Sequence, residues 1–256
     1  MATLSLSILF QIAVTTADKP NFLILFADDL GSGDLRVYGH PTTVTPNLDR
    51  LAQEGIRFSQ WYSGFHVCTP SRAAMMTGRL PIRLGLAGGS WTGGVLNSDA
   101  VGGLSSNETT SEGSRMRIMH AAIRVPTPIP LCTVAEALKA VGYATKAIGK
   151  WHLGQQPQFL PTSHGFDEYY GIPYSDDMGS SAWRLYNSKD RPPLPLIHAT
   201  ASRTNYDIIE QPTDLNLLSG RCECGSVQHG ERMPPTLLRC SSASTPSPSP
   251  SIPSPS

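Results

Sequence analysis

Neither sign of charge dominates this chain, and this excludes several classes of protein. Its 256 residues contain 20 Lys and Arg against 20 Asp and Glu, so the formal net charge is zero. The sequence has no basic stripe with interleaved stacking aromatics, which excludes a nucleic-acid-binding module. After the N-terminus, no segment approaches the roughly 20 consecutive apolar residues that cross a bilayer, so we expect no membrane span.

The N-terminal segment, residues 1–17, is apolar and ends in small residues at Ala17. This pattern predicts a secretory signal peptide; because the segment has no Lys or Arg at its start, the alternative is a poorly ordered N-terminal strand. A signal peptide would place the protein in the secretory pathway, either lysosomal or secreted. Asn107 would then head an acceptor sequon for glycosylation.

Cysteine is scarce and odd in number, since the chain has five. In an oxidising compartment one of them is left over after pairing. Cys68 is that residue if it is chemically modified. The other four then form a pairing set of undetermined connectivity: Cys132, Cys222, Cys224 and Cys240.

Apolar runs and helix signals alternate along the chain, which favours an α/β fold. We expect strands at 21–26, 56–58 and 143–148, and helices at 45–54, 70–77 and 133–140. The run at 21–26 is continuous, as in a central parallel strand that is buried on both faces. The order of elements predicts a doubly wound sheet with helices on both sides.

Two segments depart from this pattern. Residues 85–130 would make an unusually long connection for a compact domain, so we expect a disordered insertion at about 105–130. From about Arg221 the composition changes, and the chain ends in a Pro/Ser tract. Residues 221–256 are therefore predicted to be a divergent, disordered tail, and residues 18–220 the folded domain.

Asp28 and Asp29 directly follow the apolar run at 21–26. Two adjacent carboxylates at the end of a buried strand are costly unless a charge neutralises them. A divalent cation with oxygen ligands, Ca²⁺ or Mg²⁺, would do this. The alternative is a pair of turn or helix-cap residues, which is a common use of Asp.

Four further residues are candidates for chemistry. Cys68 opens the expected helix at 70–77, where the helix dipole stabilises a thiolate, although a lone cysteine is often a small buried apolar residue. Arg72 lies one turn further and shares its face. Lys150 and His152 follow the strand at 143–148 and project to one side; an isolated loop histidine is more often a surface residue.

Three blocks carry a family resemblance: Phe26-Ala-Asp-Asp29, CTPSRAAMMTGR at 68–79 and GYATKAIGKWHLG at 142–154. In this order and spacing they resemble the type I sulfatases, and the arylsulfatase A-like branch in particular. The resemblance implies the mixed α/β sheet of the alkaline phosphatase/sulfatase superfamily. It covers the N-terminal half of such a domain, so it implies a truncated sulfatase without the Asp-Asn pair, lysine and histidine of the second half.

The resemblance also implies a mechanism. The formylglycine-generating enzyme would oxidise Cys68, within C-x-P-S-R, to formylglycine, and a hydroxyl of the hydrated aldehyde would attack the sulfur of a sulfate ester. Arg72 and His152 would contact this group, and Lys150 and Ser175 the sulfate. The metal, Ca²⁺ or Mg²⁺, would be held by Asp28, Asp29 and the residue made from Cys68.

The substrate would be a sulfate ester of a small molecule, a lipid or a glycan. Related phosphohydrolases share the fold but use Ser or Thr as nucleophile, so Cys68 argues against them. The alternative function is that of an inactive, truncated fragment or isoform, because two carboxylates supply too few oxygens for Ca²⁺.

Overall fold

The structure, a computed structural model, describes residues 19–87, 94–106, 132–178, 192–227 and 237–242. The expected signal peptide, Asn107, nearly all of the expected insertion and the final Pro/Ser tract lie outside these residues. Within them, no helix is long and apolar enough to cross a membrane.

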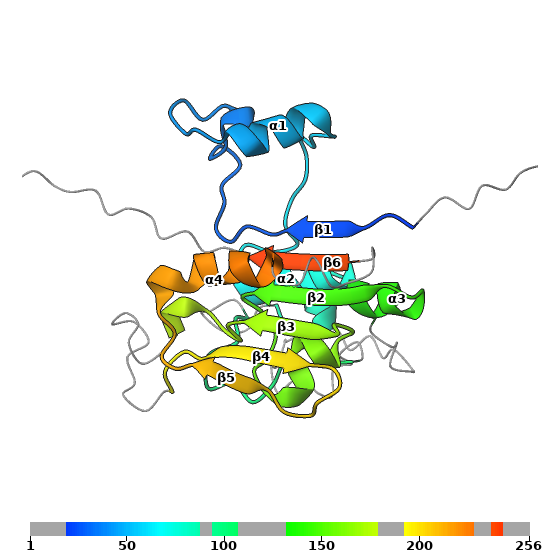
Figure 1. Cartoon of the computed structure of the whole chain (residues 1–256). Coiled ribbons are helices and arrows are strands. Elements are labelled where there is room, and N and C mark those ends of the chain that lie inside the picture. The colour runs from blue at the N-terminus through cyan, green and yellow to red at the C-terminus, as the bar shows by residue number, and fades with distance from the viewer. Residues whose placement is uncertain (1–18, 88–93, 107–131, 179–191, 228–236, 243–256) are drawn as a thin grey trace, which may run out of the picture.

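A single mixed sheet of six strands organises the described chain (Figure 1). The first four strands in spatial order run parallel, and the last two are antiparallel to their neighbours. In that order the strands are β1 (Phe22–Leu25), β6 (Leu237–Ser242), β2 (Ala144–Gly149), β3 (Glu168–Gly171), β4 (Leu196–Thr200) and β5 (Asp207–Glu210). This is the mixed α/β sheet that the sequence predicted.

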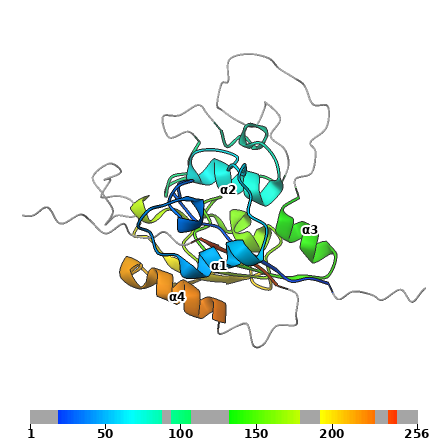
Figure 2. The same ribbon diagram turned by 90° about the horizontal axis from the view of Figure 1, so that it is seen from above.

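Helices lie on both sides of this sheet. Figure 2 shows α2 and α4 on opposite sides, so the doubly wound arrangement is confirmed. Within the described residues the α-helices are α1 (Pro46–Glu54), α2 (Cys68–Thr77), α3 (Val134–Ala140) and α4 (Leu215–Val227). Short 3-10 turns occupy Arg36–Tyr38, Pro81–Leu84, Pro157–Phe159, Pro161–Ser163 and Asp176–Met178.

Local sequence explains where the predicted helices begin and end. In α3, Thr133 and Glu136 form a reciprocal capping box that satisfies two amides of the first turn. Helix α2 ends at Gly78, whose φ of 65° suits glycine. In α1, Pro46 occupies the first turn, and the side chain of Thr45 bonds Asp49 instead of capping the helix.

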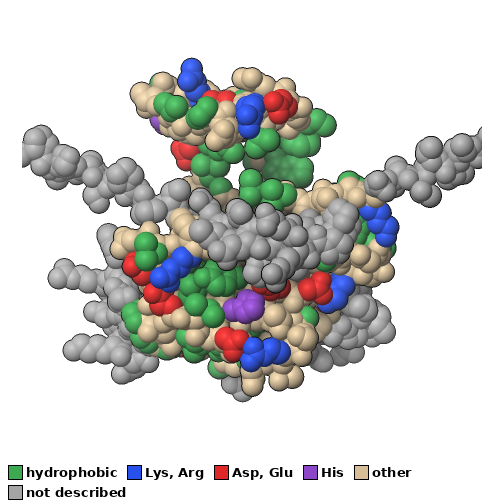
Figure 3. Space-filling view, in the orientation of Figure 1, with side chains coloured by type: hydrophobic (Ala, Val, Ile, Leu, Met, Phe, Trp, Pro, Cys, Tyr) green, Lys and Arg blue, Asp and Glu red, His purple; other side chains and the backbone are tan. Residues whose placement is uncertain are grey.

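The strand expected at 56–58 is absent, and this prediction was wrong. In Figure 1, α1 and its flanking loops form a lobe that projects away from the sheet. Ile56 and Phe58 therefore have no neighbouring strand within the described residues, and both are exposed. Apolar side chains are visible on this lobe and on the segments that join it to the body (Figure 3).

The burial expected for the first strand was also wrong. Strand β1 lies at the outer end of the sheet, and Leu23 and Leu25 are 61% and 62% exposed. A continuous apolar run predicts cover on both faces. One face of β1 is partly covered, because Ile24 packs against the core that contains Ala73 and Met76 of α2. Leu23 and Leu25 point to the other face, which has no such cover among the described elements.

The region expected to be a disordered tail contributes two elements. Helix α4 continues through residues 221–227, and β6 pairs in parallel with both β1 and β2. The physical reason is that neighbouring strands satisfy each other's backbone amides and carbonyls, and without β6 the facing edges of β1 and β2 would be open. The apolar start of β6, Leu237-Leu238, was the overlooked signal in the sequence.

The main core lies between the sheet and the helices α2 and α3. It includes Ala73 and Met76 of α2, Ala147 of β2 and Tyr169 of β3. The Tyr169 hydroxyl donates to the carbonyl oxygens of Gly149 and Ile172, at 3.0 and 2.7 Å. This packing fixes the end of β2, and Lys150 and His152 follow directly.

Gly171 lets β3 approach β2 closely at this point. A Cβ atom placed on Gly171 would lie 2.0 Å from the Gly149 carbonyl oxygen, which is backbone and has little room to move. We expect Gly171→Ala to lower the free energy of unfolding by about 1–3 kcal/mol, as overpacking does in other cores. The matched control is Gly102→Ala, where nothing lies within 4 Å. Urea denaturation would measure both, and equal stability of the two variants would contradict the prediction.

Candidate active site

The predicted site residues come together at one edge of the sheet. Asp28 and Asp29 follow β1, Lys150 and His152 follow β2, and Ser175 lies shortly after β3. Since these strands are parallel, their carboxyl ends share one edge. Helix α2 begins at this edge with Cys68, and Arg72 follows one turn later.

Lys150 is the centre of the site. Its Nζ donates to Asp28 Oδ2 at 2.6 Å, to Cys68 Sγ at 3.2 Å and to Ser175 Oγ at 3.1 Å. Three donors on one ammonium group thus bind the first residue of α2 and residues that follow β1 and β3. Lys150 is buried, so these contacts lie away from bulk water and are weakly screened by salt.

Arg72 adds a second positive charge beside Asp28. Its Nη2 lies 3.2 Å from Asp28 Oδ2, and its Nη1 donates to the Lys150 carbonyl oxygen at 2.6 Å. The guanidinium also lies over the ring of Phe26, 5.5 Å from the centroid. Burial alone would raise the pKa of Asp28, but the charges and hydrogen bonds of Lys150 and Arg72 outweigh it and lower that pKa below its usual value.

Cys68 occupies the first position of α2 and is half-buried. Its Sγ faces the Lys150 ammonium, and the free backbone amides of the helix N-terminus lie at the same place. The dipole of α2 and the ammonium both favour a negative charge here. An anion, or a nucleophile that attacks an anionic substrate, therefore fits this position.

His152 lies at the same edge in a constrained conformation. Its φ is 60°, a left-handed value that is uncommon for a residue with a side chain, and only 1% of its surface is exposed. Burial and the nearby charge of Lys150 lower its pKa to about 3, so the ring is neutral at pH 7. Nε2 lies 2.7 Å from the Leu96 carbonyl oxygen, which only accepts, so Nε2 carries the hydrogen.

This tautomer leaves Nδ1 of His152 as an acceptor. Nδ1 is buried and has no hydrogen-bond partner among the described residues. The sequence resemblance implied a contact between His152 and the group made from Cys68, but the ring hydrogen bond in the described structure is to Leu96. The free acceptor can receive a hydrogen bond from a hydroxyl at this edge.

Thr69 is a residue of the site that sequence reasoning missed. It is fully buried; its Oγ1 donates to the His152 carbonyl oxygen at 2.9 Å and accepts from the Leu96 amide at 3.2 Å. It thereby holds α2, the residue 96 segment and the end of β2 together. In the sequence, the position of Thr69 next to Cys68 was the one indication that it belongs to the site.

Asp28 and Asp29 do not by themselves form a complete metal site. Asp29 is exposed with a φ of 55°, and Asp28 Oδ2 is already paired with two cationic side chains. Among the described residues, no group of three or more His, Cys, Asp and Glu is arranged to hold a metal ion. Two carboxylates offer at most four oxygens, whereas Ca²⁺ takes six to eight. The pair fits part of such a site.

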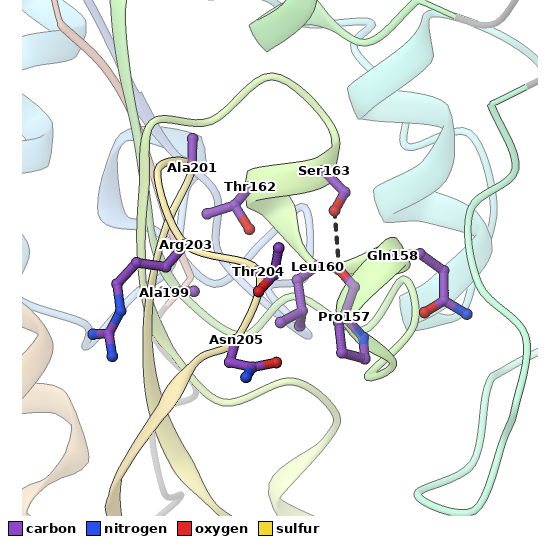
Figure 4. Close-up of a pocket in the computed structure, with 10 residues that line it drawn as sticks. All are labelled: Pro157, Gln158, Leu160, Thr162, Ser163, Ala199, Ala201, Arg203, Thr204 and Asn205. Carbon is purple, nitrogen blue, oxygen red and sulfur yellow. Dashed lines mark hydrogen bonds between the residues drawn. The ribbon is translucent and has the colours of Figure 1, made fainter.

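A hollow of about 320 Å³ lies at the opposite end of the parallel strands and does not belong to this site. Figure 4 shows that its walls come from residues 157–163 and from the connection between β4 and β5. Thr200, just before that connection, pairs with Glu168 at the start of β3. The candidate site lies beyond the other end of the same strands.

Comparison with known proteins identifies relatives. Residues 20–207 match the family model Sulfatase. The chain is 45% identical to arylsulfatase A of Bos taurus and 41% identical to N-acetylgalactosamine-6-sulfatase of Homo sapiens, over 177 residues in each case. These matches cover 68% and 69% of this chain but 29% of each relative, so the chain spans about three tenths of their length.

Solved structures show the same similarity in three dimensions. The PsFucS1 sulfatase from Pseudoalteromonas sp. superposes with a TM-score of 0.62 at 28% identity, over 88% of this chain and 44% of that one. Ps i-CgsB superposes with a TM-score of 0.60 at 26% identity, over 92% and 46%. This chain therefore corresponds to less than half of each of these solved chains.

Proposed function

Because this chain belongs to the sulfatase family, we propose that it forms part of a sulfuric ester hydrolase in which Cys68 is the precursor of the nucleophile. The observation that carries the proposal is the Lys150 ammonium, which bridges Asp28, Cys68 and Ser175. A sulfate ester carries negative charge on oxygen, and a buried cation beside the attacking group suits such a substrate.

Each residue then has a role. Cys68 is oxidised by the formylglycine-generating enzyme to formylglycine, which supplies the nucleophile. Lys150 and Arg72 hold a sulfate oxygen or the nucleophile through charge-assisted hydrogen bonds. His152 accepts a hydrogen bond from the nucleophile at Nδ1, and Ser175 orients the Lys150 ammonium.

Asp28 and Asp29 would supply some of the ligands of a Ca²⁺ or Mg²⁺ ion, with the remaining ligands from elsewhere in a longer protein. When bound, such an ion would neutralise charge on the sulfate oxygens. The substrate is a sulfate ester of a small molecule, a lipid or a glycan, and the protein acts in the secretory pathway.

A second candidate function is that of a non-catalytic sulfatase fragment. The observations that favour it are the exposed apolar residues of β1 and the donor set around Asp28, which is incomplete among the residues that the structure describes. Such a chain would keep the charged side chains of the site in place but would not hydrolyse a sulfate ester.

The test is to co-express the chain with the formylglycine-generating enzyme and to map aldehydes by hydrazide labelling and peptide mass spectrometry. We expect labelling at Cys68 and none at Cys132, which is an exposed free thiol and serves as internal control. Pro70→Ala, which breaks the C-x-P-S-R motif, should abolish the label. An unmodified Cys68 would contradict the proposal. A labelled chain that does not hydrolyse 4-nitrophenyl sulfate would favour the non-catalytic fragment.

A further inference from the structure

The distal hollow is the cavity of about 320 Å³ between residues 157–163 and residues 199–205 (Figure 4). It lies at the end of the parallel strands opposite the candidate active site, and its described walls contain none of the candidate site residues. A volume of this size is at the lower end of small-molecule sites, so it suits a ligand of about one ring.

Hydrogen bonds within the protein hold both walls of the distal hollow in place. In the first wall, Ser163 Oγ donates to the Pro157 carbonyl oxygen at 2.9 Å, and the Ser163 amide donates to the Leu160 carbonyl oxygen at 2.9 Å. In the second wall, the Ala201 amide donates to the Asp167 carbonyl oxygen at 2.8 Å. Walls that are fixed before binding lose little conformational freedom when a ligand binds, so the hollow is preorganised.

The charge in these walls is already neutralised. Among the described wall residues the charged one is Arg203, whose Nη1 and Nη2 pair with Asp207 Oδ2 and Oδ1 at 2.5 and 3.2 Å. Figure 4 shows the Arg203 side chain extending away from the other lining residues. An anionic ligand would compete with the Asp207 carboxylate for the guanidinium. The described walls therefore favour an uncharged ligand.

Four uncharged polar side chains in the walls keep their hydrogen-bonding groups available. Thr162 and Thr204 carry hydroxyls, and Gln158 and Asn205 carry carboxamides. None of these four side chains makes a hydrogen bond to another described residue. Hydroxyls and carboxamides both donate and accept hydrogen bonds. A ligand with several hydroxyl groups, each of which also donates and accepts, matches this set.

The other lining residues give the distal hollow apolar surface. Leu160 and Ala199 are buried, and Pro157 and Ala201 add further carbon atoms to the walls. A sugar ring carries C–H groups on its faces and hydroxyls around its edge, so it can contact apolar surface and polar side chains at once. A purely apolar ring would cover the polar side chains and leave them without water or a partner, which is costly.

We propose that the distal hollow binds a neutral sugar ring, separately from the candidate active site. Thr162 of one wall and Asn205 of the other bond to ring hydroxyls, and Leu160 contacts a C–H face of the ring. Because the hollow lies at the opposite end of the parallel strands, a sugar residue bound there leaves the candidate active site open. The proposal goes beyond the proposed function and does not depend on modification of Cys68.

The test is a ligand-observed NMR titration of the full chain with three neutral sugars: methyl β-D-glucopyranoside, methyl β-D-galactopyranoside and methyl α-D-mannopyranoside. We expect at least one of them to bind saturably. For that sugar, Asn205→Leu should weaken binding by about tenfold or more and Thr162→Val by about threefold or more, because each removes hydrogen bonds to the ligand. The matched control is Asn47→Leu, which replaces another exposed asparagine, on α1, and should change the affinity less than about twofold.

Two further probes test the chemistry of the ligand. Methyl β-D-glucuronide carries a carboxylate in place of a primary alcohol, and cyclohexanol is a ring with a single hydroxyl. Both should bind more weakly than the best of the neutral sugars. Circular dichroism checks that each variant folds, and Thr162→Val, which keeps the shape of the side chain, is decisive if Asn205→Leu does not fold.

Three results would each overturn the proposal. They are the absence of saturable binding by all the neutral sugars, affinity losses in the Asn205 and Thr162 variants no larger than in the Asn47 variant, and tighter binding of the glucuronide or of cyclohexanol. Cys68 stays unmodified in this experiment, so failure of the proposed enzymatic function appears in the aldehyde and turnover assays and not here.

Discussion

Replacing Lys150 with methionine is expected to lower the free energy of unfolding by about 3 kcal/mol, because removing one member of a buried ion pair leaves the other charge buried without its partner. Asp28 would lose the hydrogen bond of 2.6 Å and keep only Arg72 as a cationic neighbour. Cys68 and Ser175 would lose the same donor. The retained Arg72 pair is the reason for placing the effect at the lower end of the range for buried pairs.

Lys139→Met is the matched control. Lys139 pairs with Asp167 at 2.7 Å, but both side chains are substantially exposed, at 45% and 36%. Exposed pairs contribute about 0–1 kcal/mol, so this variant should stay close to the parent protein. Denaturant titrations at pH 7 measure both. Similar losses in the two variants would show that the Lys150 contacts are no stronger than a surface pair.

Acidification should destabilise the protein through His152 before most carboxylates titrate. The pKa of His152 is lowered to about 3 in the folded protein, while the unfolded chain keeps a value near 6.5. Between these values the unfolded state binds the extra proton, so the free energy of unfolding falls as the pH falls. The His152 contribution between pH 7 and pH 5 is about 2 kcal/mol, at 1.36 kcal/mol per pH unit below 6.5.

His152→Gln should remove most of this pH dependence while leaving an uncharged polar side chain at the position. His164 retains a smaller slope of the same sign, since burial lowers its pKa too. The control is His66→Gln, because His66 is exposed and its loss should leave the slope as in the parent. The measurement is the free energy of unfolding of the parent protein and of both variants at pH 7, 6 and 5. A slope that survives His152→Gln unchanged would assign the effect to other groups.

The sequence predicted the segments of the candidate site more reliably than their surroundings. The helix at Cys68, the capped helix after Thr133 and the strand before Lys150 all form as expected. Each depends on signals a few residues apart: a cap, a glycine stop or a buried run. Because the strands that precede Asp28 and Lys150 were expected to be parallel, their meeting at one sheet edge also followed from the sequence.

Contacts between distant segments were not predictable in the same way. The sequence did not reveal that the Lys150 ammonium binds Asp28, 122 residues away, or that Thr69 joins Leu96 to His152. It predicted burial for β1, which lies exposed at the sheet edge, and disorder from residue 221, where the last part of α4 and all of β6 form. A local sequence pattern indicates which face of a helix or strand is apolar, but it does not indicate which other element packs against that face.

The sequence by itself therefore determined the family, the order of the site residues and the helix that presents Cys68, since these depend on short spacings along the chain. Only the tertiary structure decided the charge environment of Cys68 and the neutral state of His152. Those properties arise from burial and from distances between side chains that are far apart in sequence, and both are set by the packing of the whole sheet.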